Sequence, residues 1–405
     1  MKICIVCPRL CHGGAERVAV SLANGFVGRG HEVSFFTDLF EEQTYVLESK
    51  VNIQSLVAVS APKYKKWWSA IWILRKYIKK NRPDVLIGIM SVCSIVAYLS
   101  SFGLGIPVIA TDHDAYEKPY PVKVSLFERF YKFYFCRLFK QVTVLAKADI
   151  ICLNKRGKNV LVMPNPLAID PIETIQVRKN IVLAAGRVDN WFCKGFDVLI
   201  RAWARVVSGS ESLVSSGGWK LVIAGVWRNP ETRTYLDGIA KECGVLDKIE
   251  YTGFVEDMPK LYAESSIFVL SSRYEGFGLV LIEAMSQGCA CIACDYKGRQ
   301  REIISPTQGE GVALVSSSKF QGSNSKPEKR SQELETRNSK VEACENGILC
   351  ETDNVEALAE GIQKMITDDE YREGVRANAI ERSKYYSIEN TMDRWEDLFS
   401  QIVKN

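Results

Sequence analysis

Residues 3–37 read ICIVCPRLCHGGAERVAVSLANGFVGRGHEVSFFT, and their pattern decides the kind of fold. The apolar runs 3–7 and 32–37 have the length of buried strands. The stretch 15–27 between them repeats its apolar residues at helical spacing, and a pair of glycines lies in the loop before it. A strand, a glycine loop, a helix and a second strand in this order predict a parallel sheet.

The same alternation continues to the end of the chain. In the first half we expect further strands at 84–89, 107–111, 149–153 and 160–163, and helices at 67–80, 92–102 and 122–145. The segment Met163-Pro-Asn-Pro-Leu167 interrupts the series, because two prolines in three residues break any regular element. Beyond it we expect strands at 181–185, 220–225, 249–252, 267–271 and 290–294, and helices at 195–207, 231–243, 257–265, 278–287, 355–367 and 369–384.

These elements predict an α/β protein with two Rossmann-like β/α/β domains, at 1–165 and 166–385, facing across a cleft in which a ligand would bind. The final stretch, 387–404, has the apolar spacing of a packed amphipathic helix. The polar stretch 316–345 has too few apolar residues to order itself, so we expect a flexible surface insertion there. A partner-binding segment is the alternative for this stretch.

The composition is that of an ordinary folded protein. The chain has 405 residues, 47% apolar and 25% charged, which suits two or three domains. A net charge of +4 and a pI near 8.3 are too weakly basic for a nucleic-acid-binding protein. The 13 cysteines are scattered through apolar stretches, and the Cys-x-x-Cys pair of Cys291 with Cys294 lies inside an apolar run in a chain with only three histidines. This pattern indicates buried thiols in a reducing compartment. Since we recognise no signal sequence and no membrane-spanning run, we expect a cytoplasmic protein.

The strongest chemical signal is Arg273-Tyr-Glu-Gly-Phe-Gly-Leu-Val-Leu-Ile-Glu283. Its first glutamate, Glu275, lies in a glycine-rich loop after an apolar strand, where the backbone can approach a ligand closely. The helix that follows offers the free N–H groups of its first turn to an anion. Its second glutamate, Glu283, lies on the second turn of that helix, where a carboxylate can accept both hydroxyls of a ribose. The plainer interpretation is a strand–turn–helix with two solvated carboxylates.

Five motifs resemble those of the family 4 retaining glycosyltransferases, which have the GT-B fold, and they follow one another along the chain as they do in that family. They are Glu275 and Glu283 at this spacing, Gly13-Gly14-Ala-Glu-Arg, Ala185-Gly186-Arg187 with Lys194-Gly195, Thr252-Gly253-Phe254, and Tyr386-Ser-Ile with Trp395. Members similar to this chain build bacterial surface glycans on polyprenyl-diphosphate carriers, N-acetylgalactosaminyl transferases among them. The resemblance implies that 1–165 binds the acceptor, that 166–385 binds the donor, and that a helix at 386–405 crosses back to the first domain.

The resemblance also implies roles for single residues. Glu283 would bind the ribose, and Glu275 would face the sugar or stabilise the developing oxocarbenium ion. Arg187 and Lys194 would clamp the β-phosphate, on which charge grows as the nucleoside diphosphate leaves. No protein nucleophile is implied, and the leaving phosphate would take the acceptor's proton. The residues expected to act in catalysis are Glu275, His113, Arg187 and Lys194. Those expected to bind the donor are Glu283, Gly276, Phe277, Gly278, Leu279, Gly186, Phe254, Gly13 and Gly14.

His113 follows the predicted strand 107–111, at the strand end where ligands of parallel sheets gather. Family members often carry a histidine here, near the transferred sugar. Its neighbours Asp112 and Asp114 form an Asp-x-Asp motif, which is the metal-binding motif of the other glycosyltransferase fold. Their carboxylate oxygens would suit Mg²⁺ or Mn²⁺ as ligands. Because the order of motifs contradicts that fold, we expect no metal and no cofactor.

Two stretches mix cations with aromatic residues. The first, 63–80, contains Trp67, Trp68 and Trp72, and basic amphipathic helices with tryptophan bind anionic membranes. The second stretch is 127–140, and its cations are Arg129, Lys132, Arg137 and Lys140. The alternative is that the apolar faces pack in the core while the cations are solvated. We expect a peripheral contact with the inner face of the cytoplasmic membrane through 63–80.

The expected activity is transfer of a hexose or N-acetylhexosamine, with retention, from a nucleotide-sugar donor. The donor is expected to be a UDP-sugar, and the acceptor a glycan or a polyprenyl-diphosphate-linked molecule in bacterial surface glycan synthesis. The alternatives are a nucleotide-sugar epimerase of the same fold and a non-catalytic nucleotide-sugar-binding subunit. An NAD-linked oxidoreductase is disfavoured, because the glycines at 13 and 14 do not form Gly-x-Gly-x-x-Gly.

Overall fold

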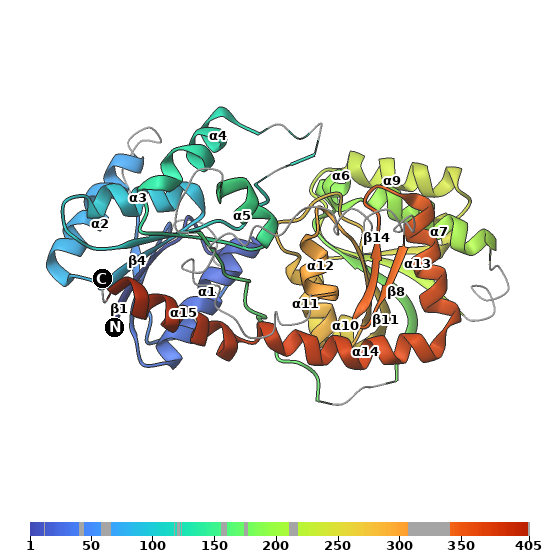
Figure 1. The fold of residues 1–405 in the computed structure, drawn as a ribbon. Coiled ribbons are helices and arrows are strands. Elements are labelled where there is room, and N and C mark those ends of the chain that lie inside the picture. The colour runs from blue at the N-terminus through green and yellow to red at the C-terminus, as the bar shows by residue number, and fades with distance from the viewer. Residues whose placement is uncertain are drawn as a thin grey trace, which may run out of the picture. The chain divides into compact units, whose positions relative to one another are not determined.

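The chain forms two compact units, Met1–Ala168 with Tyr386–Asn405 and Ile169–Tyr385 (Figure 1). The described residues of each unit form a seven-stranded sheet with helices packed on it. The computed structural model describes residues 1–11, 13–39, 44–57, 66–116, 118–119, 122, 124–154, 160–173, 177–209, 218–306 and 341–403.

The sheet of the first unit is parallel throughout, in the order β3-β2-β1-β4-β5-β6-β7. Its strands are β1 (Lys2–Val6), β2 (Glu32–Thr37), β3 (Asn52–Ser55), β4 (Val85–Ile89), β5 (Val108–Thr111), β6 (Gln141–Val144) and β7 (Val160–Val162). Its helices are α1 (Gly14–Gly28), α2 (Lys66–Asn81), α3 (Met90–Ser101), α4 (Leu126–Phe133), α5 (Lys147–Asn154) and α15 (Ile388–Val403). Strand β4 is apolar and buried along its whole length, as expected for a parallel sheet covered on both faces.

The last helix, α15, packs on α1 and completes the first unit. Trp395 of α15 is buried, and its ring meets that of Phe26 edge to face, with 5.8 Å between the centroids. Gly25 of α1 allows the close approach, because a Cβ there would lie 2.7 Å from the sulfur of Met392. The expected packed amphipathic helix at the end of the chain is therefore confirmed.

One part of the first unit differs from its prediction. The expected helix 122–145 contains α4, a short 3-10 helix and then β6, while the expected strand 149–153 lies in α5. A short apolar run does not distinguish a buried strand from a buried helix. In α5 the buried carboxylate of Asp149 accepts the N–H of Tyr116 at 3.1 Å, a tertiary contact that no local pattern shows. The prediction also lacked β3, a four-residue strand whose sequence is mostly polar.

The sheet of the second unit has the order β10-β9-β8-β11-β12-β14-β13, and only β13 runs antiparallel to its neighbour. Its strands are β8 (Lys179–Ala185), β9 (Lys220–Ala224), β10 (Ile249–Gly253), β11 (Ser265–Leu270), β12 (Ala290–Cys294), β13 (Val341–Cys344) and β14 (Gly347–Cys350). Its helices are α6 (Trp191–Lys194), α7 (Phe196–Gly209), α9 (Pro230–Glu242), α10 (Met258–Glu264), α11 (Leu279–Ser286), α12 (Arg299–Ile304), α13 (Val355–Thr367) and α14 (Asp369–Ser383).

Every strand and helix expected between 181 and 384 is confirmed, although the prediction lacked the short α6 and α12. The expected insertion 316–345 needs a correction at its end, because residues 341–344 form the edge strand β13. Residues 316–340 lie outside the described part of the chain, so the expected flexible loop stays a prediction there.

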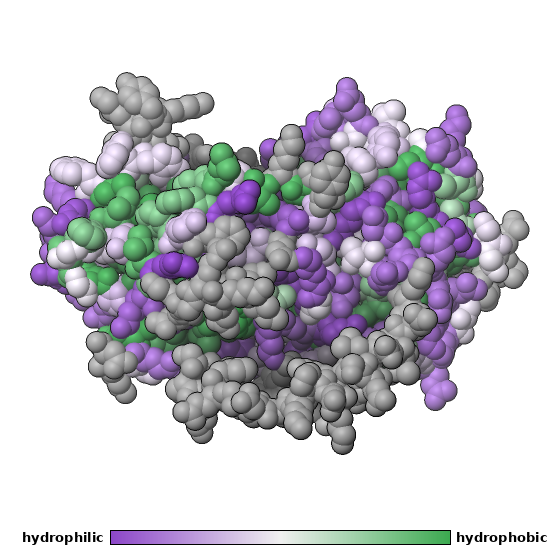
Figure 2. Space-filling view, turned by 45° about the horizontal axis from the view of Figure 1, so that its top comes forward, coloured by the Kyte–Doolittle hydropathy of each residue, from purple (hydrophilic) through white to green (hydrophobic). Residues whose placement is uncertain are grey.

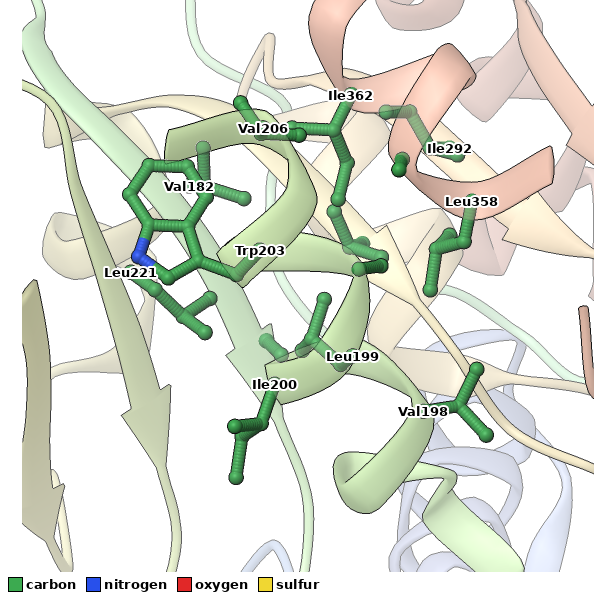
Figure 3. Packing of buried hydrophobic residues seen from close by; sticks show 14 of the residues in the cluster. Val182, Val198, Leu199, Ile200, Trp203, Val206, Leu221, Ile292, Leu358 and Ile362 are labelled. Atoms are coloured by element: carbon green, nitrogen blue, oxygen red, sulfur yellow. The ribbon is translucent and has the colours of Figure 1, made fainter. Parts of the chain in front are cut away.

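The core of the second unit surrounds Trp203 of α7 (Figure 3). This side chain is fully buried and lies beside Val182 of β8 and Leu221 of β9. Ile362 of α13 belongs to the same cluster, so α7 and α13 share one apolar layer over the sheet. Because α7 begins at Phe196, two residues after Lys194, this packing anchors the chain next to Lys194.

The cysteines pack as small apolar residues. Twelve have described side chains, and none of these is in a disulfide; nine are buried. Burial raises the pKa of Cys289 and Cys294 to about 12, so these thiols are neutral near pH 7.

Helices α2 and α4 expose aromatic side chains, and Figure 2 shows apolar residues on this face of the first unit. Trp68 and Trp72 are 73% and 66% exposed, whereas the opposite stripe of α2 is buried in the core. Phe127 and Phe130 of α4 are about half exposed. Lys132, one of the expected surface cations, is instead buried, because its ammonium group donates to the carbonyl of Ala115 at 2.9 Å.

Candidate active site

The parallel strands of the second unit send their following loops to one edge of the sheet, where ligands of such folds bind. The loop after β8 carries Gly186, Arg187 and Lys194, and the loop after β11 carries Glu275. Phe254 follows β10 at the same edge. Most of the residues expected in the site are therefore brought to one edge of one sheet.

A backbone contact joins the first two of these loops. Gly195 has φ +65°, and a Cβ there would lie 2.0 Å from the carbonyl oxygen of Ser271, so only glycine fits. The hydroxyl of Ser271 donates to the carbonyl of Lys194 at 2.8 Å. Lys194 therefore lies directly over the end of β11, where the loop of Glu275 begins.

Lys194 and Glu275 form an ion pair at this point. The distance from Nζ of Lys194 to Oε1 of Glu275 is 2.5 Å, and the side chains are 21% and 15% exposed. The hydroxyl of Ser272 donates to the same carboxylate oxygen at 2.8 Å and orients it. A cation and a carboxylate, partly withdrawn from water, thus occupy the centre of the edge.

Gly186 and Arg187 complete the loop after β8. A Cβ on Gly186 would lie 3.0 Å from Cε of Lys194, so the absence of a side chain lets the lysine stem cross this residue. Gly225, at the end of β9, approaches the carbonyl of Gly186 so closely that a Cβ would lie 1.8 Å from it. The side chain of Arg187 is exposed and forms no ion pair with any residue of the described ranges. It is available to an anion at this edge.

The loop of Glu275 leads through Gly276 and Phe277 into α11. Gly278 precedes the helix with φ +99°, in the left-handed region that favours glycine. The N–H groups of Leu279 and Val280 begin the first turn and have no acceptor in a preceding turn of helix, whereas the N–H of Leu281 donates to the carbonyl of Gly278 at 2.9 Å. The helix therefore begins where it was expected, and its role in binding an anion stays a prediction.

Glu283 lies on the second turn of α11 and is only 3% exposed. The phenol of Tyr262 donates to its carboxylate at 3.4 Å. The interpretation of Glu275 and Glu283 as two solvated carboxylates is therefore wrong. The ribose-binding role of Glu283 stays a prediction.

Phe254 is 68% exposed at the end of β10, after Gly253 with φ +71°. The ring of Trp227, from the loop after β9, lies 3.9 Å from the position of a Cβ on Gly253. The carboxylate of Asp189 accepts the N–H of Arg228 at 2.7 Å and so ties this loop to the loop after β8. Trp227 and Asp189 thus lie at the edge that carries the candidate site, and our sequence reasoning did not single them out.

The first unit contains the remaining expected residues. The ring nitrogens of His113 lie 3.0 Å from Oδ1 of Asn165 and 3.0 Å from Oγ1 of Thr111. Burial lowers the pKa of His113 to about 4, although the hydrogen bond that Nδ1 of His113 donates to Oδ1 of Asn165 opposes this effect. Sequence reasoning missed Asn165, although it lies between the two prolines that marked the domain boundary.

The two aspartates beside His113 have partners within the protein. Asp112 is 6% exposed and accepts the N–H of Asp114 at 3.2 Å, while Asp114 pairs with Lys118 at 2.5 Å. Burial raises the pKa of Asp112 to about 6. Within the described ranges, no group of three or more His, Cys, Asp or Glu side chains is arranged to hold a metal ion.

Gly13 and Gly14 lie at the start of α1. Gly13 is extended, and a Cβ there would lie 1.7 Å from Oε2 of Glu16, so glycine lets this carboxylate fold back over the loop. Glu16 is nearly buried and pairs with Arg9 at 3.3 Å. The loop is thus packed against a carboxylate of its own helix.

Two family models match the chain. The model for Glycosyltransferase Family 4 matches residues 12–169, and the model for Glycosyl transferases group 1 matches residues 168–320. The chain is 26% identical, over 99% of both chains, to a Campylobacter jejuni protein named GalNAc-alpha-(1->4)-GalNAc-alpha-(1->3)-diNAcBac-PP-undecaprenol alpha-1,4-N-acetyl-D-galactosaminyltransferase. It is 29% identical to the amylovoran biosynthesis glycosyltransferase AmsD of Erwinia amylovora, over 72% of this chain and 80% of the relative.

Solved structures of the same fold include sucrose-phosphate synthase from Thermosynechococcus elongatus, with a TM-score of 0.74 and 18% identity over 99% of this chain and 98% of that one. Anabaena HepE in complex with UDP and glucose has a TM-score of 0.71 and 16% identity, over 99% of this chain and 100% of that one. These likenesses show the fold that the two units share with known proteins.

The partly buried position of His113 generates a prediction about its protonation. Because burial disfavours the imidazolium, the folded chain should bind fewer protons than the unfolded chain between about pH 6.5 and pH 4. This difference alone lowers the free energy of unfolding as the pH falls through that range, but the raised pKa of Asp112 acts in the opposite direction. We therefore expect the imidazole resonance itself, followed by NMR on histidine-labelled protein, to titrate near pH 4.

The His113→Asn variant identifies the resonance among those of the three histidines. A midpoint at or above the ordinary value of about 6.5 would show that the imidazole is open to water and would contradict this geometry.

Proposed function

The chain belongs to the family 4 glycosyltransferases and has their two-unit GT-B fold, and we propose that it transfers a sugar from a nucleotide-sugar donor with retention. The donor is a UDP-sugar and the transferred group a hexose or N-acetylhexosamine. The acceptor is a glycan carried on a polyprenyl diphosphate. UDP is the nucleotide bound in the structure of HepE, and an undecaprenyl-diphosphate glycan is the acceptor in the name of the Campylobacter relative.

The ion pair of Lys194 with Glu275 is the observation that supports this proposal most strongly. When a nucleoside diphosphate leaves a sugar, negative charge grows on its β-phosphate, so cations placed there stabilise the transition state. Lys194 supplies one cation and the exposed Arg187 a second, while the start of α11 adds N–H groups at Leu279. In this proposal the phosphate replaces Glu275 as the partner of Lys194.

Glu275 then faces the sugar and stabilises the oxocarbenium ion that forms as the bond from the anomeric carbon to the phosphate oxygen breaks. The acceptor oxygen bonds to the same face of that carbon, which retains the configuration. The acceptor's proton passes to an oxygen of the leaving phosphate, so no protein nucleophile is needed. His113 of the first unit is neutral near pH 7. Glu283 of the second unit binds the ribose.

The proposal requires no metal ion, because Arg187 and Lys194 supply the positive charge that a divalent ion would bring to a diphosphate. The family comparisons give no support to the epimerase or to the non-catalytic subunit, so neither is proposed.

We place the enzyme on the inner face of the cytoplasmic membrane, where a lipid-linked acceptor and a soluble donor meet. No helix in the parts of the chain that the structure describes could span a bilayer. Trp67, Trp68 and Trp72 are exposed on α2 together with Lys76, whose ammonium group lies 5.5 Å from the ring centroid of Trp72. Exposed tryptophan beside lysine suits the headgroup region of an anionic bilayer.

Replacing Lys194 tests the donor site. We expect Lys194→Met to raise the Kd for UDP by about tenfold or more, since a hydrogen bond to a charged group contributes roughly 1.5–3 kcal/mol. Isothermal titration calorimetry measures this Kd, and EDTA in the buffer should leave the wild-type value unchanged.

The control is Lys179→Met, which removes the ion pair with Glu264 at 2.5 Å on the same sheet, at the start of β8. If the wild type and Lys194→Met bind UDP with the same Kd, Lys194 does not belong to the donor site. A requirement for a divalent ion would restore Asp112 and Asp114 as candidate ligands.

The membrane contact is tested by replacing Trp67, Trp68 and Trp72 together with alanine. Full burial of one large apolar side chain contributes roughly 1.5–3 kcal/mol, so we expect at least about tenfold weaker binding to phosphatidylglycerol vesicles in a sedimentation assay. A variant with Tyr235→Ala and Leu246→Ala, exposed apolar residues of the second unit, serves as the control. Unchanged sedimentation of the tryptophan variant would exclude α2 as the membrane contact.

A further inference from the structure

Arg273 has no role in the chemistry above, yet its side chain pairs with two carboxylates next to the candidate site. It follows β11, and its side chain is only 11% exposed. Its Nη1 and Nη2 donate to the two carboxylate oxygens of Asp197 at 2.7 and 2.8 Å. Its Nε donates to Oδ1 of Asp353 at 2.9 Å.

Two further contacts join Arg273 to α6, the short helix that ends at Lys194. Its backbone N–H donates to the carbonyl of Cys193 at 2.8 Å, and its Nη1 donates to the carbonyl of Phe192 at 2.8 Å. The guanidinium also lies over the ring of Phe192, 4.4 Å from its centroid.

Arg273 therefore joins three loops that follow different strands. Phe192 and Cys193 belong to the loop after β8, Arg273 to the loop after β11, and Asp353 to the loop after β14. Asp353 has φ +60°, a left-handed conformation that aspartate tolerates better than most residues. The carboxylate of Asp353 contacts Arg273 while its backbone has this left-handed conformation.

The contacts lie next to the two residues on which the proposed chemistry depends. Cys193 immediately precedes Lys194, and Arg273 precedes Glu275 by two residues. Since the two carboxylates and the carbonyl of Phe192 engage all three guanidinium nitrogens, Arg273 does not itself serve as a phosphate ligand. Its effect on a ligand passes through Lys194 and Glu275.

We propose that Arg273 is a positioning residue, held by Asp197 and Asp353, that fixes Lys194 against Glu275 and thereby presents Lys194 to the diphosphate. This inference rests on the donor site proposed above. A lysine at 273 cannot reproduce it, because one ammonium group cannot make the planar, bidentate contact with Asp197. Small displacements of a positioned charge are costly, since misplacement by about 1 Å can reduce a rate 100-fold.

The experiment compares UDP with UMP, which lacks the β-phosphate, in the wild type and in Arg273→Lys. We expect the Kd for UDP to rise by about tenfold or more and the Kd for UMP by less than about threefold, because only the contact beyond the α-phosphate depends on Lys194. The control is Arg301→Lys in the same unit. Arg301 pairs with Asp295 and Glu342 at 3.1 and 2.8 Å and makes no contact with α6.

An equal rise for both nucleotides, or no rise in a folded Arg273→Lys variant, would overturn the positioning role. If that variant does not fold, Asp353→Asn replaces it. Asp353 is 58% exposed, and asparagine tolerates its left-handed backbone. For Asp353→Asn we again expect the Kd for UDP to rise more than the Kd for UMP, although by a smaller factor than in Arg273→Lys. Equal changes in the two Kd values would overturn the proposal. If the wild type itself binds neither nucleotide, it is the donor site proposed above that fails, and this inference fails with it.

Discussion

The site of the second unit depends on one close backbone approach, that of Gly195 to the carbonyl of Ser271. No side chain fits between them, so the loop after β8 lies directly on the end of β11. This approach places the ammonium of Lys194 beside the carboxylate of Glu275. Any substitution at Gly195 would push the loops apart and separate the two charges, even though glycine contributes no functional group.

The rigid parts of the second unit support this approach from two sides. Below the edge, Trp203 anchors α7 in the core, so the helix that continues from Gly195 cannot shift freely. At the edge, Arg273 joins the neighbouring loops through Asp197 and Asp353. The result is an ammonium group that is held in place before any ligand binds, and a preorganised cation is what the proposed stabilisation of a leaving diphosphate requires.

Sequence reasoning predicted the parts that depend on local pattern. The long amphipathic helices and apolar strands of the second unit were found, and so were Lys194 and Glu275, because glycines and charges follow strands at recognisable places. It failed for β6 and α5, whose short apolar runs are ambiguous. It also missed the contacts of Arg273, because its partner Asp197 lies 76 residues away in the chain and no local spacing marks the pair. Lys132 was expected at the surface for the same reason, because its burial and its hydrogen bond to Ala115 depend on tertiary structure.

The most direct test is a crystal structure of the protein with UDP bound. We expect the β-phosphate within hydrogen-bonding distance of Lys194 and Arg187, the ribose hydroxyls at Glu283, and the uracil near Phe254. In that complex Glu275 should no longer pair with Lys194. A diphosphate bound elsewhere, with the ion pair of Lys194 and Glu275 intact, would contradict the central claim that this pair forms the donor site.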